Sequence, residues 1–385
     1  MRIAIVTLPL HTNYGGILQA YALQTILEQM GHKVEHLQPK VIYSKLHPAW
    51  KMPFVYCKRF ARKYFGGERK LPIFMHPQKW IRKNTDKFIA KHINCRYLEK
   101  NKWNESLAQD YDAIIFGSDQ VWRPRYAYPI ERYFGAFLGE KNIKRISYAA
   151  SFGTADNEYT EEQIKQCSSL LKKFNAVSVR ENSGVELCRS LFNINSTHVI
   201  DPTLLLSKED YIQRLSLATT PKSNGNLSVY ILDNDKRIDK FIKEFSEKNN
   251  LKPFKTNSRV EEHDAPISER QQPPLEQWLR SFYDAEFIIT DSFHACIFSI
   301  IFQKPFLCIG NKCRGMARFE SLLSMFDLTD RLVDISELNN HKISDIDWTK
   351  VNKILSSKRS EAHSFLKIHY KNILNAQNIS YSTGV

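Results

Sequence analysis

The chain has 385 residues, of which 42% are hydrophobic and 25% are charged, and its formal net charge is +14. This composition excludes a disordered polyelectrolyte, and the length favours about two domains. No stretch approaches the roughly 20 apolar residues of a membrane-spanning helix, and the short apolar run at the start lacks the features of a signal peptide. We therefore expect a cytoplasmic protein, at most peripheral at the inner face of a membrane.

Seven cysteines are scattered along the chain, and none forms a Cys-x-x-Cys pair. Their number is odd and their spacing fits no zinc site, so we interpret them as reduced thiols in a reducing compartment. The sequence accordingly predicts no bound metal.

The positive charge is concentrated in residues 39–100, which contain 16 Lys and Arg residues against three acidic residues. Aromatic residues are interleaved with these cations, among them Trp50, Phe54, Phe60 and Trp80. A local basic block concerns a partner or a site rather than the fold. Three interpretations stay open: a solvated helical surface, a lining for an anionic substrate, and contact with anionic lipid headgroups.

The first predicted elements form a strand–turn–helix–strand unit. Residues 2–8 are apolar and β-branched, a glycine-containing turn covers 13–16, and residues 17–30 have helical spacing up to Gly31. A second short strand is predicted over 32–37. This opening is typical of a doubly wound α/β domain.

The rest of the N-terminal half repeats this design after an interruption. Residues 41–105 are rich in bases and aromatic residues, and we expect mostly helices there. The elements that follow are a strand over 113–116, a strand ending at 151–153, a helix over 161–174, a strand ending at 180–181, a helix from 182 and a closing segment over 198–206. We predict a first domain over 1–205, with a basic helical insert at about 41–105.

A second α/β unit follows a polar stretch over 207–225, which is interpreted as a linker. Its predicted elements are strands at 227–233, 287–289 and 305–310, helices at 236–249, 275–283 and 316–326, a helix directly after the strand at 287–289, and a charged helix over about 348–376. We predict a second domain over 226–345 and a C-terminal helix and tail over 346–385. The predicted fold is therefore two Rossmann-like α/β domains facing a cleft, an arrangement called GT-B in glycosyltransferases.

In open α/β sheets, ligands bind at the carboxyl ends of the strands. That rule selects five segments whose polar groups should meet at one edge of a cleft. They are residues 12–16, 117–122, 151–153, 180–183 and 291–294.

His294 belongs to the sequence Asp291-Ser292-Phe293-His294, between an apolar strand and a helix. Backbone N–H groups at a helix N-terminus favour an anion, and an imidazole there can exchange protons near neutral pH. The alternative is a capping cluster in which Asp291 or Ser292 accepts hydrogen bonds from free amides.

Arg180 ends a mostly apolar strand, where a charge needs a partner. Its guanidinium suits bidentate contact with phosphate or carboxylate, and the alternative is an ion pair with Glu181 or with an acid from another strand. Arg314 and Arg318 lie in a basic segment before a helix, which is interpreted either as a second phosphate contact or as a solvated loop.

Two further turns carry candidate acceptor-binding residues. Asn13, Tyr14 and Gly15 form a turn that resembles a phosphate cradle but lacks the GxGxxG spacing, and its glycines are alternatively explained by tight packing. Asp119 could bind sugar hydroxyls and Trp122 could stack on a sugar ring; alternatively Asp119 caps a helix and Trp122 belongs to the core.

Taken in order, several motifs resemble the polysaccharide pyruvyltransferase family over nearly the whole chain. They are NYGGILQAYALQ, FGSDQVW, SYAASFG, VSVRE, HVIDPTLLL, ITDSFH and ARFESLL. Where a glycine is expected after the motif histidine, this chain has Ala295. The segment 41–100 is the least similar part, which leaves the acceptor open.

The resemblance implies a GT-B-like fold and a transferase of cell-surface polysaccharide biosynthesis. Such an enzyme moves the enolpyruvyl-derived unit of phosphoenolpyruvate onto two hydroxyls of a sugar, giving a pyruvate ketal. It implies His294 as the acid/base and Arg180 as the donor anchor, with Ser292, Arg314 and Arg318 as further donor contacts. Phosphoenolpyruvate is then the donor substrate, no cofactor is needed, and the acceptor is a sugar or a lipid-linked oligosaccharide.

Three other functions are compatible with parts of the sequence. A GT-B glycosyltransferase using a nucleotide sugar shares the fold, although no acid is evidently placed for the ribose. A non-catalytic sugar- or phosphate-binding protein is the second, although the polar residues at the strand ends are all present. A nucleic-acid binder is the third, but no recognisable module is visible, and we expect no nucleic-acid partner.

Overall fold

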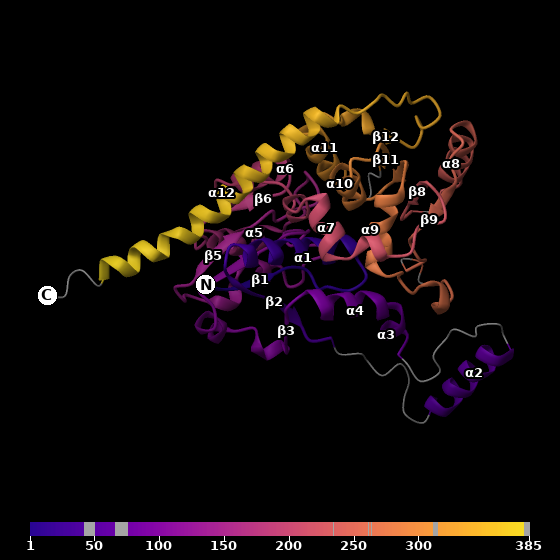
Figure 1. The fold of residues 1–385 in the computed structure, drawn as a ribbon. Coiled ribbons are helices and arrows are strands. Elements are labelled where there is room, and N and C mark those ends of the chain that lie inside the picture. Colours follow the sequence, from indigo (N-terminus) through magenta and orange to yellow (C-terminus); the bar gives the residue numbers. More distant parts are fainter. Residues whose placement is uncertain are drawn as a thin grey trace.

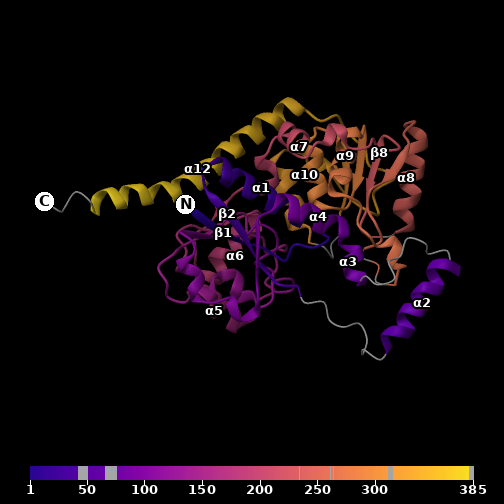
Figure 2. The same ribbon diagram turned by 60° about the horizontal axis from the view of Figure 1, so that its bottom comes forward.

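The computed structural model describes residues 1–41, 51–65, 76–233, 235–260, 262, 264–310 and 315–380, without the side chains of residues 63 and 368–380. Figures 1 and 2 show two α/β domains side by side, with the long helix α12 (Trp348–Ser380) running along both. No helix in this described part is long and apolar enough to span a bilayer.

The N-terminal domain is built on a five-stranded parallel sheet with the order β3-β2-β1-β4-β5. The strands are β1 (Arg2–Val6), β2 (Lys33–Pro39), β3 (Cys95–Leu98), β4 (Ala113–Phe116) and β5 (Lys144–Ser147). Isolated bridges extend the sheet toward β6 (Ser178–Val179), which pairs with β7 (Thr197–His198). This order is that of a Rossmann-like fold.

The C-terminal domain contains a second five-stranded parallel sheet, with the order β12-β11-β10-β8-β9. Its strands are β8 (Leu227–Tyr230), β9 (Pro253–Lys255), β10 (Phe287–Thr290), β11 (Phe306–Gly310) and β12 (Leu332–Asp334). Two Rossmann-like domains that face a cleft are therefore present, and the predicted fold class is confirmed.

Helices cover the sheets and supply the connections between parallel strands. Those of the N-terminal half are α1 (Tyr14–Gln29), α2 (Met52–Phe65), α3 (Pro77–Ile81), α4 (Lys83–His92), α5 (Glu161–Leu171) and α6 (Asn182–Phe192). Those of the C-terminal half are α7 (Lys208–Arg214), α8 (Lys236–Lys248), α9 (Leu275–Asp284), α10 (Phe293–Ile301) and α11 (Ala317–Met325). The central strands are almost entirely buried, which is why they are continuous apolar runs in the sequence.

Two segments differ from their predicted structure. The segment 41–105 was expected to be mostly helical, yet it also contributes β3, an edge strand that pairs only with β2. Its four residues, CRYL, are mixed in polarity because one side of an edge strand faces solvent, so no apolar run marks it. The predicted linker 207–225 contains helix α7, which begins at a reciprocal capping box between Ser207 and Asp210.

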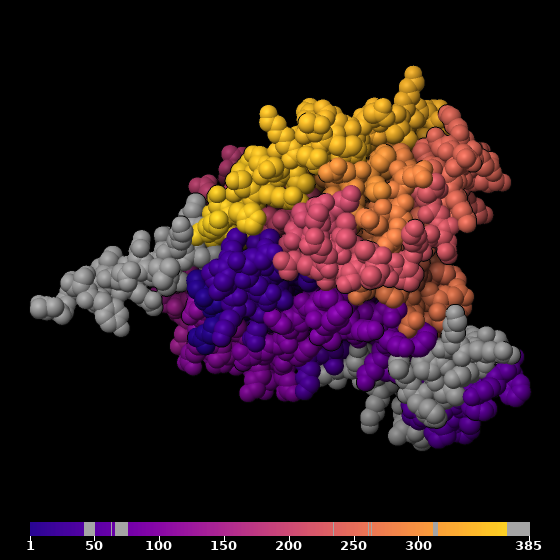
Figure 3. Space-filling model, viewed as in Figure 1, coloured from indigo at the N-terminus to yellow at the C-terminus, as the bar shows by residue number. Residues whose placement is uncertain are grey.

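The two domains share one apolar core. A single cluster of buried side chains combines α1 with α9 and α10, and it includes Ala362 and Leu366 of α12. Arg359 of α12 donates hydrogen bonds of 2.6 Å to the carbonyls of both Leu204 and Leu206. Figure 3 shows α12 as the yellow band that lies across the surface of both halves, so the relative position of the domains is fixed by packing.

Candidate functional site

A cleft of about 620 Å³ separates the two domains, and residues from both line it. Asn13, Gly15 and Asp119 line it from the N-terminal domain, and Ser292 and His294 from the C-terminal domain. All five follow the carboxyl ends of parallel strands, as the general rule for open α/β sheets requires.

His294 lies in the first turn of α10, directly against the first turn of α1 from the other domain. A Cβ atom added to Gly15 would be 2.0 Å from Nδ1 of the imidazole, so only glycine allows this close approach. On its other side, Nε2 of His294 lies 3.7 Å from Oδ2 of Asp201. The ring is thus enclosed by α1 and by an acidic side chain.

Burial and charge together determine the protonation of His294. Burial lowers its pKa to about 4; Arg180 lowers it too, and Asp201 opposes the shift only in part. The imidazole is therefore neutral at pH 7 and is able to accept a proton.

Arg180 and Asp201 form a buried ion pair behind His294. Nη1 of Arg180 donates to Oδ2 of Asp201 at 2.7 Å, and Oδ1 of Asp201 accepts hydrogen bonds from the backbone N–H and the hydroxyl of Thr203. Burial alone would raise the pKa of Asp201, but Arg180, His294 and Thr203 together outweigh it and the pKa is lowered. Burial would likewise lower the pKa of Arg180, but Asp201, Asp119 and Glu181 outweigh it and the pKa is raised.

A second arginine lies close to this pair. The guanidinium of Arg180 lies 4.7 Å from the centre of the Phe293 ring, and that of Arg318 lies 5.3 Å from it. Both distances are within the range of cation–π attraction. Burial and the neighbouring Arg180 lower the pKa of Arg318 to about 10, so it is still charged at pH 7.

Carboxylates balance these two arginines in the described part of the site. Nη2 of Arg180 lies 3.7 Å from Asp119, and its Nε lies 4.0 Å from Glu181. Glu181 in turn accepts hydrogen bonds from Ser151 and from the N–H groups of residues 152 and 153. Arg180 is thus ion-paired with an acid of another segment, the alternative that the sequence left open. Its Nε and Nη2 make no hydrogen bond to any described residue.

Asp119 connects this charged cluster to the cleft. Its backbone is in the left-handed region (φ 69°), which aspartate tolerates better than most residues. It does not cap a regular helix: Oδ1 accepts only the N–H of the next residue, Gln120, at 2.9 Å. A Cβ on Gly16 would lie 3.2 Å from Oδ2 of Asp119, so α1 also packs closely here.

Tyr14 and Trp122 do not line the cleft, so their prediction as acceptor-binding residues is wrong. Tyr14 is 1% exposed, packs on Trp278 and donates a 2.6 Å hydrogen bond to the carbonyl of Pro273. Trp122 is fully buried, stacks on Phe134 and donates to the carbonyl of Tyr133. Each ring buries more apolar surface in the core than it could in an open cleft.

The capping alternative for the segment before α10 holds only in part, because Asp291 accepts free backbone amides but not those of α10. Ser292 occupies the N-cap position of α10, but its side chain makes no capping hydrogen bond. The carboxylate of Asp291 instead accepts the N–H groups of Leu232 and Asp233, and so fixes the end of β8. Arg314 lies outside the described residues.

Asp201 was not assigned to the site from the sequence. Glu181 and Phe293 lie within the selected segments 180–183 and 291–294, but neither was given a role in the site. Asp201 follows the end of strand β7, so the strand-end rule that selected the other segments also marks it.

A larger and more open groove of about 1030 Å³ lies beside β2 and β3. Its charged side chains are used within the fold: Arg96 pairs with Asp110 at 2.8 Å, and Tyr111 donates to Glu35 at 2.7 Å. The chemistry therefore points to the interdomain cleft. No group of three or more potential metal ligands occurs among the described residues.

Solved structures similar to this chain include three sugar-related enzymes. A co-structure of S. aureus MnaA with UDP has 12% identity, coverage of 97% of both chains and a TM-score of 0.48. UDP-GlcNAc 2-epimerase from Neisseria meningitidis has 12% identity, coverage of 96% of this chain and 93% of that chain, and a TM-score of 0.45. Sucrose-phosphate synthase from Thermosynechococcus elongatus has 11% identity, full coverage of both chains and a TM-score of 0.42.

No curated protein sequence matches the chain. The sequence model of the family described as polysaccharide pyruvyl transferase, in contrast, matches residues 13–312, which include every described residue of the His294 cluster except Arg318. This match extends over most of the chain, from the first turn of α1 to the end of β11. The protein therefore belongs to the polysaccharide pyruvyl transferase family.

Proposed function

We propose that this protein transfers the enolpyruvyl-derived unit of phosphoenolpyruvate onto two hydroxyls of a sugar, forming a pyruvate ketal in cell-surface polysaccharide biosynthesis. The observation that carries the proposal is the neutral, buried His294, placed between α1 and the Arg180–Asp201 pair at the wall of the cleft. Family membership supplies the reaction class.

Phosphoenolpyruvate carries a phosphate and a carboxylate close together, and the site offers positive groups that are likewise close together. Arg180 keeps Nε and Nη2 without a hydrogen bond to described residues, and the guanidinium of Arg318 lies near the same Phe293 ring. The first turn of α10, with no side-chain cap, adds partial positive charge. We assign donor binding to Arg180, Arg318 and Ser292.

The proposed chemistry consists of two additions of a hydroxyl to C2 of the donor. A proton is added to the methylene carbon, the first sugar hydroxyl forms a C–O bond at C2 and loses its proton, and the bond from C2 to the phosphate oxygen breaks. The second hydroxyl then closes the ring and releases its proton. One proton stays on the new methyl group and the other leaves with phosphate.

Neutral His294 is suited to accept the proton of an attacking hydroxyl. Once protonated, it is stabilised by Asp201 at 3.7 Å, and it can return the proton to the methylene carbon of the donor. Because these steps require only proton transfer and fixed charges, we propose no cofactor besides the donor substrate.

Acceptor binding is assigned to the side of the cleft formed by Asn13, Gly15 and Asp119. The carboxylate of Asp119 can accept a hydrogen bond from a sugar hydroxyl while Arg180 holds it in place. We propose a sugar acceptor that is carried on a lipid at the inner face of the membrane.

The test is an incubation of the purified protein with phosphoenolpyruvate and a panel of sugars, with phosphate release and the mass of the acceptor as readouts. We expect phosphate release only with acceptors that have two neighbouring free hydroxyls, together with the mass increase of a ketal. Methylation of either hydroxyl should abolish ketal formation. Transfer from a nucleotide sugar without consumption of phosphoenolpyruvate, or no calorimetric binding of phosphoenolpyruvate, would refute the proposal.

A further inference from the structure

Helix α2 (Met52–Phe65) has a composition unlike that of the other helices. Its 14 residues include four Lys or Arg residues and no acidic residue. Large apolar side chains are exposed on it: Phe54 is 72% exposed, Phe60 49%, Tyr64 56% and Phe65 85%. None of its described side chains is buried, so α2 does not use its aromatic residues to fold onto the body of the protein.

Four of the five aromatic residues of α2 gather on one half of the helix surface, opposite most of its cations. At about 100° per residue, Phe54, Phe60, Tyr64 and Phe65 share that half with Cys57 and Ala61. Arg59 and Arg62 fall on the other half together with Val55 and Tyr56, and Lys58 lies at the border next to Phe65. This is the pattern of an amphipathic helix with an apolar and a basic side.

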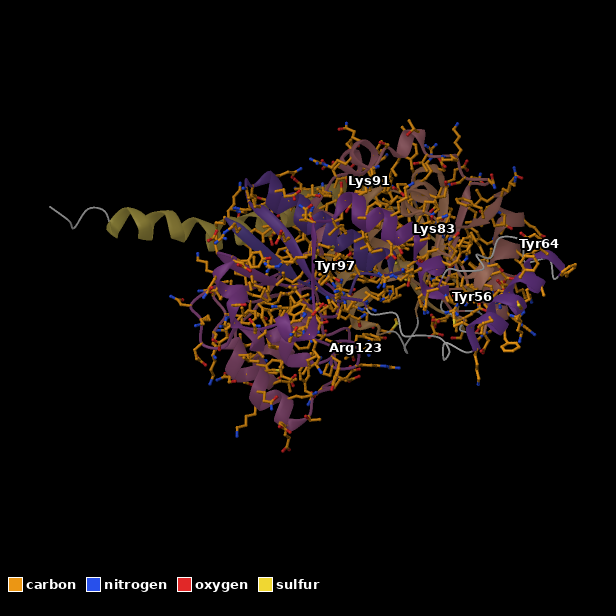
Figure 4. The ribbon with its side chains drawn as sticks, turned by 90° about the horizontal axis from the view of Figure 1, so that it is seen from below. Tyr56, Tyr64, Lys83, Lys91, Tyr97 and Arg123 are labelled. Atoms are coloured by element: carbon orange, nitrogen blue, oxygen red, sulfur yellow. The ribbon has the colours of Figure 1, made fainter. Side chains whose placement is uncertain are left out.

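The position of α2 relates it to the cleft. Figures 1 and 2 show α2 set apart from the two domains, on the side of the molecule where α3 lies. In Figure 4, seen from below, Tyr56 and Tyr64 of α2 lie on the same side of the molecule as Lys83 of α4.

Helices α3 and α4 are in turn joined to the cleft wall. Gln271 donates to the carbonyl of Trp80 at 3.0 Å, and Asn84 to the carbonyl of Gln272 at 2.7 Å. Gln272 itself donates to the carbonyl of Thr12, and both Gln272 and Thr12 line the cleft. Helices α3 and α4 therefore adjoin the substrate cleft, and α2 lies on their side of the molecule.

We infer that α2 docks the protein on a lipid surface that contains anionic headgroups. The helix lies in the plane of the membrane surface. Its aromatic half is buried at the boundary between headgroups and acyl chains, and its cations extend to the lipid phosphates. Charge complementarity supports this partner, because the helix offers only positive charge.

Other partners would use only one side of this helix. An apolar groove in a protein would cover the aromatic half and leave the cations without a role, and a nucleic acid duplex would contact only the cations. Single strands use both cations and aromatic stacking, but one strand cannot contact two opposite faces of a helix. A bilayer interface contacts both because the helix is partly immersed in it.

The benefit of docking rests on the proposed function, because docking would bring the cleft to an acceptor that is carried on a lipid. It identifies the acceptor class as a lipid-linked sugar. Vesicle binding needs no substrate, however, so docking and catalysis can fail independently and can be measured separately.

The experiment is sedimentation of the full chain with vesicles of phosphatidylcholine alone and with vesicles that also contain phosphatidylserine. We expect binding only to the anionic vesicles, and weaker binding as salt increases. The double variant Lys58→Glu/Arg62→Glu should bind at least about twentyfold more weakly, because each cation near an anionic surface contributes about fivefold. The variant Phe54→Ser/Phe65→Ser should also bind weakly, although it keeps every charge.

The matched control is the double variant Lys165→Glu/Lys172→Glu, which makes the same change in charge. Lys165 is exposed on α5 and Lys172 is exposed at the C-terminal end of α5, and this helix lies away from α2. This control should bind like the wild type, and all variants should keep wild-type turnover on a water-soluble acceptor. Equal loss of binding in the control, or no binding to anionic vesicles at low salt, would overturn the inference. So would binding of a single-stranded oligonucleotide that depends on α2 while vesicles leave the protein in the supernatant.

Discussion

At the scale of single residues, the site combines a neutral imidazole with charges that are held in fixed positions. Four neighbouring charged groups influence the protonation of His294: Asp201, Arg180, Asp119 and Arg318. Desolvation is the largest of the influences, because the ring is enclosed between two domains. The chemistry expected of His294 therefore depends on its surroundings more than on its own ordinary pKa.

His294→Ala should lower turnover by about 10²-fold or more, the usual contribution of a general acid–base group. Since kcat/KM reports the free enzyme, and the pKa of free His294 is about 4, the acid limb that this residue causes should lie well below 6.5. The measurement is kcat/KM against pH, within the range where circular dichroism shows a folded protein. An acid limb near pH 6.5 would contradict the lowered pKa of His294. If kcat/KM instead falls as the pH rises through about 4, His294 acts as an acid in the free enzyme.

The same shift provides a control through stability. Between about pH 6.5 and pH 4 the unfolded chain binds a proton at this histidine and the folded protein does not. The contribution of His294 to stability is thus complete above pH 6.5 and is lost as the pH falls toward 4. The free energy of unfolding of His294→Gln should accordingly fall less steeply with acid than that of the wild type.

Arg180→Lys should weaken binding of phosphoenolpyruvate by about tenfold or more, because lysine can pair with Asp201 but cannot also present a planar fork to the donor. The measurement is calorimetric binding of phosphoenolpyruvate.

Arg280→Lys is the matched control, since Arg280 is a buried arginine paired with Asp284 at 2.8 Å and lies outside the cleft lining. It should lose stability but not donor affinity. Unchanged affinity in Arg180→Lys would make Arg180 a structural ion pair only.

At the scale of elements, the site depends on two helices that begin at the same place. The first turn of α1 and the first turn of α10 come from different domains, and they meet at Gly15 and His294. The missing side chain at Gly15 is what lets the imidazole lie against the backbone of α1.

Gly15→Ala should lower turnover by about 10- to 100-fold, because the new Cβ would displace the imidazole by more than an ångström. Stability should also fall, because the enclosed imidazole has to move to make room for the new methyl group. Gly16→Ala is the milder comparison: its Cβ would lie 3.2 Å from Asp119 and requires only a small adjustment. Steady-state kinetics and thermal unfolding of both variants test this, and full activity of Gly15→Ala would show that the ring need not occupy this position.

At the scale of the whole molecule, α12 is the element that joins the two halves after the chain has completed both sheets. It begins beyond the C-terminal sheet and crosses to the N-terminal domain, where Phe365 contacts Tyr148 at 6.2 Å between ring centres. A site made of residues from both domains needs such a fixed relation between them.

Arg359→Ala should lower the free energy of unfolding by about 1–3 kcal/mol, because two buried carbonyls lose a charged donor. Lys358→Ala removes the neighbouring pair with Glu361, which is largely in water, and should cost less than about 1 kcal/mol. Urea unfolding of the two variants gives the comparison. Losses of equal size would show that the contact of α12 with residues 204–206 contributes little.

The sequence by itself determined most of the elements and the edge at which the site forms. Buried parallel strands are continuous apolar runs, and the helix that starts after Thr160 has capping residues at fixed spacing. Because ligands bind at the carboxyl ends of such strands, the positions of His294 and Arg180 followed from local patterns alone. The short edge strand β3 did not, since it has no apolar run.

Only the tertiary structure decided which polar and aromatic groups face the cleft and which chemistry they can perform. Tyr14 and Trp122 lie beside cleft residues in the sequence, but each ring turns into the core, because the space there is set by side chains from distant segments. Asp201 is paired with Arg180 across 21 positions of the chain. The low pKa of His294 arises from burial by the opposite domain, and no local sequence pattern contains that information.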